Sequence, residues 1–474
     1  MSGRLSEASL RDVPRGVGRP AYDRAQLKRG VVHIGLGAFH RAHQAPLFDR
    51  LAEEGDLRWG VIGASLRSTG ARDALIPQQG LYSLFVEDQE RHERSIIGSI
   101  LDVIAAREEP RRLVEAIADP ETRLATVTVT EKGYRIDPAS GELDEEDVGV
   151  RADLASLEEP STMAGYLASG LKLRRERGLS PIAILSCDNI SKNGTKLREA
   201  VTRIARAHDT DLALWIEDNC PFPNSMVDRI VPATSREDIE RARAELGLID
   251  QASVRTEPFS QWVIEHFEGE RPELERHGVQ FTSDVAPFEE AKLRLLNGAH
   301  SAMAYLGGLA GIDTVDAFIS KDWGVKFVRR LWSELAPTLR GSADLDLGDY
   351  QQMLLQRFAN PALGHRLDQI AADGSQKIPQ RLVPPFEMLL ERNEEPRAIA
   401  LVIAAWIRWQ LGRRDSGEMF KVDDPLGPAT AKLLKGASDP KDQLRSILTL
   451  RPVFPERIAS DRRFQDLLAG LLKS

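Results

Sequence analysis

Short apolar runs alternate with helix-forming segments through the first 285 residues of this chain of 474. Runs of this kind, bounded by turn residues, are typical of strands that are buried on both faces of a sheet. We expect the principal strands at residues 30–37, 59–65, 124–130 and 182–186. We expect helices at residues 110–117, 162–176 and 193–208. This alternation predicts an α/β fold with a parallel, doubly wound sheet.

The character of the sequence changes near residue 285. From Phe288 onward strand signals vanish, and helical patterns interrupted by prolines continue to Leu472. We therefore expect an α/β domain of residues 1–285 and a mainly α-helical domain of residues 286–474, since a chain of this length exceeds one hydrophobic core.

Two parts of the first domain stand outside the alternating pattern. Residues 1–29 are polar and charged and are predicted to form a loosely packed arm. Residues 227–233 and 253–267 are of β type, and we expect them at an edge of the sheet.

Composition narrows the possible functions. The net charge is −9, from 63 basic and 72 acidic residues, which argues against nucleic acid or an anionic membrane as the main partner. The N-terminus lacks an apolar core, and the longest apolar run, 398–407, is about half the length that crosses a bilayer. With only two cysteines and no metal-binding motif, we expect no disulfide framework, no metal and a cytoplasmic location.

A Gly-x-Gly turn follows the first predicted strand. Gly35 would permit a tight turn, and Gly37 would let a pyrophosphate approach the start of a helix that continues through Ala38 and Phe39. The third glycine position of the dinucleotide fingerprint holds His40 instead, so a plain turn is the alternative. We take Gly35, Gly37, Ala38 and Phe39 as candidate cofactor-binding residues.

The segment after the second predicted strand bears on the choice of cofactor. No carboxylate occurs there before Asp73, although an acid at this point commonly binds the ribose hydroxyls of NAD. Arg67 and neighbouring hydroxyls could instead accommodate the 2′-phosphate of NADP, or Arg67 could be a solvated surface charge. NAD is the expected cofactor, and NADP is not excluded.

The most polar cluster lies on an otherwise apolar helical segment of residues 286–311. With Lys292 at 0° and about 100° per residue, Glu289 falls near 60°, His300 near 80° and Asn297 near 140°. Arg294 falls near 200° and is expected to face solvent. Burying these groups is costly unless they serve one another or a ligand, so the cluster is a candidate catalytic site; a structural ion pair of Glu289 and Lys292 is the alternative.

Polar residues also follow two of the predicted strands. Glu131 comes after the third strand and Asn189 after the fourth. The carboxyl ends of parallel strands face the ligand crevice, which places both residues for function, although Asn and carboxylates also act as caps and turn formers.

These segments together resemble the polyol-specific long-chain dehydrogenase/reductase family, the group of mannitol 2-dehydrogenases and fructuronate reductases. The resemblance covers most of the chain, and its most specific parts are the Asn-Ser-Met-Val-Asp-Arg-Ile run and the Lys-x4-Asn-x2-His helix. The matching segments are residues 35–43, 128–134, 186–189, 222–230, 292–300 and 373–379.

The resemblance implies a Rossmann-type N-terminal domain, a helical C-terminal domain and an active site in the cleft between them. It implies metal-independent hydride transfer between a sugar alcohol or aldonate and its 2-keto sugar. The positions that match the family's site are Lys292 as general base, Asn189 and Asn297 at the reacting oxygen, His300, Asp228 and Lys377 at the substrate, and Glu131 and Glu289 as acids that pass the proton to solvent.

Elementary chemistry agrees with these implied roles. Oxidation of a secondary alcohol requires loss of its O–H proton as the hydride leaves carbon, and a desolvated lysine has a lowered pKa that lets it accept a proton. Two amide groups can donate hydrogen bonds to the alkoxide-like oxygen.

The substrate is the least determined element. D-mannonate and D-fructuronate carry a carboxylate, which favours a cationic partner such as Lys377 or Arg381, whereas mannitol and fructose do not. The segment from Ser65 to Ser68 resembles the fructuronate-reductase branch and departs from mannitol enzymes, which have acids there, so we favour mannonate/fructuronate with mannitol/fructose as the alternative.

More distant alternatives are a phosphogluconate-type hydroxyacid dehydrogenase, which would have a fuller glycine fingerprint, and a non-catalytic nucleotide sensor. We expect a small-molecule substrate, no nucleic-acid or membrane partner, and a monomer or weak oligomer.

Overall fold

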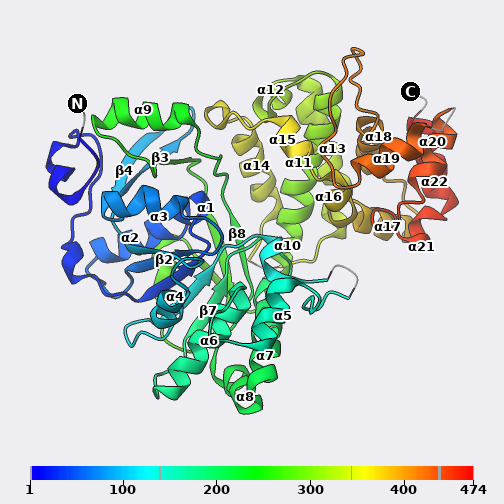
Figure 1. The fold of residues 1–474 in the computed structure, drawn as a ribbon. Coiled ribbons are helices and arrows are strands. Elements are labelled where there is room, and N and C mark those ends of the chain that lie inside the picture. Colours follow the sequence, from blue (N-terminus) through cyan, green and yellow to red (C-terminus); the bar gives the residue numbers. More distant parts are fainter. Residues whose placement is uncertain (1–2, 138–139, 343, 436–438, 473–474) are drawn as a thin grey trace. The chain divides into compact units, whose positions relative to one another are not determined.

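The computed structural model describes residues 3–137, 140–342, 344–435 and 439–472, and the chain divides into two compact units (Figure 1). The first is Met1–Ala286 and the second is Pro287–Ser474. The sequence analysis placed the boundary near residue 285.

A five-stranded parallel sheet organises the first unit, which we call the main sheet. Its order is β5-β2-β1-β6-β7, so the chain moves outward from β1 in both directions, and the predicted doubly wound α/β fold is confirmed. The strands are β1 (Val31–Ile34), β2 (Val61–Ser65), β5 (Ile100–Ala105), β6 (Leu124–Val127) and β7 (Ala183–Ser186).

Alternate residues of each strand feed separate cores on the two faces of the main sheet. Val32 of β1 lies in the core that also holds side chains of α4, α6 and α7, whereas its neighbour Val31 packs with α2. Both faces are therefore covered, which explains the continuous apolar runs in the sequence. The helices of this unit are α1 (Ala38–Ala42), α2 (Ala45–Glu53), α3 (Gly70–Leu75), α4 (Pro110–Ile117), α5 (Val148–Ala155), α6 (Met163–Glu176), α7 (Asn193–His208), α8 (Thr210–Asn219) and α9 (Arg236–Leu246).

The later β segments do not extend the main sheet; β8 and β9 lie at the edges of smaller sheets, as expected, whereas β10 lies in the middle of its sheet. They form two separate three-stranded sheets, β11-β10-β8 and β4-β3-β9. The reason is that each segment has another partner: β8 pairs antiparallel with β10, and β9 pairs with β3 of a hairpin that the apolar pattern did not reveal. The strands are β3 (Tyr82–Glu87), β4 (His92–Ile97), β8 (Ser225–Asp228), β9 (Val254–Thr256), β10 (Gln261–Glu265) and β11 (Gln280–Thr282).

The N-terminal segment is also better packed than the sequence suggested, and the expectation of a loose arm was wrong. Leu5, Val13 and Val17 are buried in a small core of their own with residues from distant parts of the first unit. The guanidinium of Arg24 donates to the carbonyls of Gly98 and Ile100 at 2.8 Å each. A few apolar side chains and one buried cation thus fix a segment whose composition is mainly polar.

The second unit is helical throughout its described residues, as predicted. Its buried side chains form one core that includes Trp332, Trp406 and Tyr305. Its helices are α11 (Gly298–Ala302), α12 (Val315–Ile319), α13 (Asp322–Leu335), α14 (Leu347–Phe358), α15 (Leu367–Ala371), α16 (Gly374–Arg381), α17 (Val383–Glu391), α18 (Arg397–Trp409), α19 (Gly427–Lys435), α20 (Pro440–Ile447), α21 (Glu456–Ala459) and α22 (Arg462–Leu471).

The helix that carries Lys292 departs from regular α geometry. It begins as α10 (Ala286–Ala291), continues as a π-helix over Lys292–Asn297, returns to α geometry in α11 and is π-helical again over Met303–Gly307. The N–H of Gly298 reaches the carbonyl of Leu293, five residues back. The uniform 100° spacing assumed from the sequence was therefore wrong here, because hydrogen bonds to the fifth residue widen the turn.

Close packing at Gly374 positions α16, which carries Lys377 and Arg381. A Cβ atom at Gly374 would lie 2.3 Å from the Tyr305 hydroxyl and 2.5 Å from Trp406 Nε1. Both aromatic side chains are fully buried, so neither has room to move away.

We predict that Gly374→Ala destabilises the protein by about 1–3 kcal/mol, the usual cost of overpacking a core. The matched control is Gly470→Ala in α22, where a Cβ has nothing within 4 Å. That change should stabilise by about 0.5–1 kcal/mol, because alanine is the better helix former. Thermal unfolding of the full chain measures both; equal unfolding midpoints for Gly374→Ala and wild type would contradict the packing argument.

Candidate active site

A tight turn at Gly35 joins β1 to α1. Gly35 has φ +102°, and a Cβ atom there would lie 2.0 Å from the Thr128 carbonyl oxygen, so only glycine fits. The N–H groups of Gly35 and Leu36 both donate to the carbonyl of Ala64, at 2.7 and 3.1 Å. Gly37 is the residue that precedes α1, and a Cβ atom there would make only an ordinary contact of 3.7 Å with the Gly35 carbonyl oxygen.

A pocket of about 330 Å³ opens beside this turn at the carboxyl ends of β1, β2 and β6. We call it the dinucleotide pocket. Ala38 and Phe39, in the first turn of α1, are not among its lining residues. Its lining residues are Gly35, Leu36, Gly37, Ser65, Leu66, Arg67, Ser68, Thr128, Val129, Thr130, Gly133, Arg135, Ser161, Thr162 and Met163.

The dinucleotide pocket fits a pyrophosphate-containing cofactor. The absent side chain at Gly37 leaves room beside the start of α1, where backbone N–H groups favour an anion. Two arginines line the pocket, and no carboxylate does. Arg67 is exposed, while Arg135 pairs with Asp147 at 3.0 Å.

Asp188, which the sequence analysis did not single out, holds the loop after β6. Its carboxylate accepts hydrogen bonds from the N–H groups of Val129 and Thr130, at 3.0 and 2.8 Å, and from the Tyr134 hydroxyl at 3.1 Å. Thr130 has φ +68°, a strained conformation for a β-branched residue. Burial raises the pKa of Asp188, and the backbone donors act in the opposite direction.

Three other expected site residues belong to the first unit. Glu131 is exposed at the start of the short 3₁₀-helix Glu131–Tyr134, next to pocket-lining Thr130. Asn189 is exposed and directly follows Asp188. Asp228 is buried, 4% exposed, at the end of β8 and therefore in a different sheet from the Gly35 turn.

The second unit holds the residues of the irregular helix. Lys292 is buried, 8% exposed, at the first position of the π segment, and Glu289 and Asn297 are half-buried. Arg294 does not project into solvent as expected. It is half-buried and donates to the hydroxyl of Thr338 at 2.9 Å and to the same residue's carbonyl, because the chain after α13 covers this side of the helix.

Four basic side chains gather around His300, and we call the five residues together the basic cluster. They come from α11, α14, α16 and the loop before α15, and two of them, Arg357 and His365, carried no signal in the sequence. Burial lowers the pKa of His300 well below its ordinary value, and the nearby positive charges add to the effect. The basic cluster consists of His300, Arg357, His365, Lys377 and Arg381.

Contacts within the basic cluster fix several of its members. The rings of His300 and His365 meet edge to face with centroids 5.1 Å apart. Arg381 donates to the Asn297 carbonyl at 3.1 Å and to the Ser301 hydroxyl at 3.0 Å. Lys377 donates to the carbonyls of Ile370 and Ala372, at 3.1 and 2.5 Å. These bonds tie α16 to the helix that carries Asn297 and to the carboxyl end of α15.

His300 has hydrogen-bonding capacity to spare. Its Nε2 atom is buried and makes no hydrogen bond to the described residues. Buried polar atoms in native proteins nearly always have a partner, so a ligand hydroxyl or a water molecule is the group that this atom can receive.

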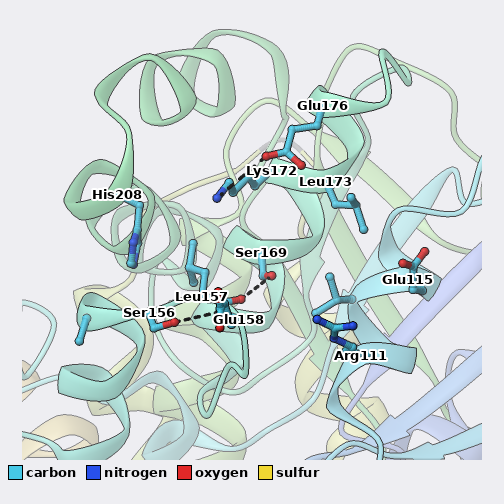
Figure 2. A pocket seen from close by; sticks show the side chains of 12 residues that line it. Arg111, Glu115, Ser156, Leu157, Glu158, Ser169, Lys172, Leu173, Glu176 and His208 are labelled. Carbon is cyan, nitrogen blue, oxygen red and sulfur yellow. Dashed lines mark hydrogen bonds and ion pairs between the residues drawn. The ribbon is translucent and has the colours of Figure 1, made fainter.

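A larger pocket of about 560 Å³ lies on the helical surface of the first unit (Figure 2). It is lined by α4, the end of α5 and α6, and its charges are mixed, with Lys172 4.0 Å from Glu176. None of the residues expected at the active site lines it, so size alone does not identify the site.

The described part of the chain contains no helix long and apolar enough to span a membrane. Within the same residues, no group of three His, Cys, Asp or Glu side chains is arranged to hold a metal ion.

Comparisons with known proteins match both units. Residues 29–276 match the mannitol dehydrogenase Rossmann domain, and residues 284–470 match the mannitol dehydrogenase C-terminal domain. The D-mannonate oxidoreductase of Escherichia coli K12 is 39% identical over 454 residues, which cover 94% of this chain and 93% of that protein. A mannitol 2-dehydrogenase of Pyrenophora tritici-repentis is also 39% identical, over 96% of this chain and 81% of its own length.

A solved structure gives the same result. The ternary complex of Pseudomonas fluorescens mannitol 2-dehydrogenase with NAD and D-mannitol has a TM-score of 0.88 and 36% identity, covering 99% of this chain and 96% of that one. The resemblance inferred from the sequence is thus confirmed. The chain belongs to the mannitol dehydrogenase family of nicotinamide-dependent oxidoreductases.

Proposed function

We propose that this protein interconverts D-mannonate and D-fructuronate by hydride exchange with a nicotinamide cofactor. The observation that carries the proposal is the basic cluster around His300. The positive charges near His300 are those of Arg381, Arg357 and Lys377, whereas burial lowers the pKa of the neighbouring His365. A sugar acid supplies the carboxylate that such a set of donors favours.

The names of the relatives support a sugar alcohol or a sugar acid as the substrate class. The choice between the two is therefore argued from the residues of this site. One is named a D-mannonate oxidoreductase and another a mannitol 2-dehydrogenase, at equal identity. Mannitol and fructose end in a hydroxymethyl group, which gains less from nearby cations than a carboxylate does. Nη1 of Arg381 donates to the Asn297 carbonyl and to the Ser301 hydroxyl, and a planar guanidinium is the side chain best suited to a carboxylate.

The reaction assigns Lys292 the role of general base. As the hydride leaves the carbon of the CH–OH group, the amine of Lys292 accepts the hydroxyl proton and a ketone forms; reduction runs in reverse, with the ammonium as acid. When bound, the nicotinamide cofactor supplies the hydride acceptor or donor. Burial of Lys292, 8% exposed, supports this role because desolvation favours its neutral form.

Amides and carboxylates complete the proposed machinery. The side-chain N–H groups of Asn189 and Asn297 donate to the reacting oxygen and stabilise its negative charge. Glu131 and Glu289 exchange the proton between Lys292 and solvent, a role suited to the exposed Glu131 and the half-buried Glu289. His300 and Asp228 bind substrate hydroxyls, and Lys377 and Arg381 bind the carboxylate end.

For the cofactor we propose NAD; the lining of the pocket does not exclude NADP. Ser65, Arg67 and Ser68 line the dinucleotide pocket after β2, and no lining carboxylate is available to repel a 2′-phosphate. Gly35 and Gly37 hold the pyrophosphate, with Ala38 and Phe39 forming the first turn of the helix behind it.

Replacement of Arg381 tests the substrate assignment. Wild type should reduce fructuronate with a kcat/KM at least about tenfold above that for fructose, and Arg381→Gln should lower the fructuronate value about 10–100-fold, as loss of a charge-assisted hydrogen bond predicts. The value for fructose should change less than about threefold, since its hydroxymethyl group has no charge to pair. Steady-state NADH oxidation measures all four values.

The control for this experiment is Arg397→Gln, an exposed arginine at the start of α18 that pairs with Glu395. It should leave both substrates unaffected. Equal losses on fructuronate and fructose in Arg381→Gln would mean that Arg381 only supports Asn297 and Ser301, and the sugar-acid assignment would fall.

Replacement of Arg67 tests the cofactor proposal. Arg67→Ala should weaken NADPH binding about tenfold, as loss of an arginine–phosphate contact implies, while leaving NADH binding within about twofold. Fluorescence titration of the reduced cofactors measures both. Arg236→Ala, at the exposed start of α9 and outside the pocket, is the control. An NADPH affinity that Arg67→Ala leaves unchanged would place the 2′-phosphate elsewhere.

A further inference from the structure

His33 is a fully buried polar residue in the middle of β1, close to the Gly35 turn. In the register of the main sheet it lies beside Gly63 of β2 and Thr126 of β6. Its Nδ1 atom is 2.7 Å from the Thr126 hydroxyl, and its Nε2 atom is 2.9 Å from the hydroxyl of Thr128. A polar residue is rarely placed in such a core without a specific role.

The hydrogen-bond pattern fixes which ring nitrogen carries the proton. The Thr128 hydroxyl donates its single hydrogen to the Gly35 carbonyl at 2.8 Å. It must therefore accept from His33, so Nε2 bears the hydrogen and Nδ1 accepts from Thr126. Burial lowers the pKa of His33 to about 3, with the Gly35 carbonyl acting in the opposite direction, so the ring is neutral at physiological pH.

These hydrogen bonds restrain one peptide group, the one between Gly35 and Leu36. Its carbonyl accepts from the Thr128 hydroxyl, and its N–H donates to the Ala64 carbonyl at 3.1 Å. With both ends of the peptide plane held, the plane cannot rotate without breaking two hydrogen bonds. This peptide leads directly into Gly37 and the N-terminus of α1, the part of the dinucleotide pocket suited to an anion.

His40 adds a second restraint on the same ring. It occupies the third glycine position of the fingerprint, and its ring stacks on that of His33 with centroids 3.5 Å apart and planes 20° apart. Both rings are fully buried. The His40 ring therefore packs against the His33 ring at the position where the fingerprint has a glycine, and this stacking restrains the plane of the His33 ring.

We infer that His33 is a positioning residue for cofactor binding: its Nε2–H orders the Thr128 hydroxyl, which fixes the Gly35–Leu36 peptide and with it the turn that leads to Gly37, where the pyrophosphate would bind. The inference rests on the proposed function only in that a dinucleotide binds at this turn. His33 itself does not line the dinucleotide pocket, whereas Thr128 does.

The test uses matched replacements in the full-length protein. Thr128→Val keeps the shape and removes the hydroxyl, and Thr128→Ser keeps the hydroxyl. Loss of one buried hydrogen bond should raise the Kd of NADH about tenfold in Thr128→Val, while Thr128→Ser stays within about threefold. His33→Leu should resemble Thr128→Val, and His33→Gln, which retains a side-chain N–H donor, should recover part of the affinity.

Two readouts separate positioning from a general loss of structure. In Thr128→Val the KM for NADH should rise by a larger factor than kcat falls, because the hydroxyl donates to the turn beside the dinucleotide pocket, whereas the exposed control Arg397→Gln should change neither value. Amide hydrogen exchange at Leu36 and Gly37, measured without ligand, should be faster in Thr128→Val and His33→Leu than in the conservative variants.

The outcomes distinguish this inference from the proposed function. If wild type fails to bind NADH, the proposed function is wrong, and the exchange measurement still decides whether the turn depends on Thr128. If wild type binds NADH and Thr128→Val binds it equally well, or Thr128→Val and Thr128→Ser lose affinity equally, the positioning role of His33 is overturned.

Discussion

A lysine buried within an irregular helix is the constraint on which the rest of the second unit depends. Lys292 is 8% exposed and begins a π segment, and burial of an amine is tolerated only where its charge is relieved or partnered. Side chains of two other helices hold this helix through hydrogen bonds. Trp332 Nε1 of α13 donates to the Leu295 carbonyl at 2.9 Å, and Arg381 of α16 donates to the Asn297 carbonyl at 3.1 Å. π-helical turns of this kind are rare and frequent at functional sites.

In the first unit, side chains likewise hold the backbone of two loops. Two polar side chains hold the turn at Gly35 and the loop at Thr130: Thr128, directly after β6, holds the turn, and Asp188, which follows β7, holds the loop. Each uses a buried acceptor or hydroxyl to fix backbone that lies next to the dinucleotide pocket. Preorganised backbone of this kind reduces the ordering cost of binding a cofactor. In both units, therefore, side-chain hydrogen bonds hold the backbone that carries the candidate site residues.

The sequence predicted what periodicity controls and missed what depends on contacts between distant residues. The strands around Val31 and Val61 and the helices after Pro110 and Asn193 followed from apolar patterns. The π turns at Lys292 could not be predicted, because nothing in a single sequence distinguishes them from α turns. Arg357 and His365 join the basic cluster only through tertiary packing. The pairing of β9 with β3 was missed for the same reason, and the arm was misjudged because its few buried apolar residues are outnumbered by polar ones.

Replacement of Lys292 tests the central claim, that this buried amine is the base of a sugar-acid dehydrogenase. Lys292→Met preserves volume and removes the titratable group, and Lys326→Met, at an exposed position of α13, is the control. Under single-turnover conditions with fructuronate and NADH, Lys292→Met should slow hydride transfer about 10²–10⁴-fold, the usual contribution of a general acid or base. NADH affinity should be unchanged, and the control should match wild type. Hydride transfer within about tenfold of wild type in Lys292→Met would contradict the account, because the proton would then have another acceptor.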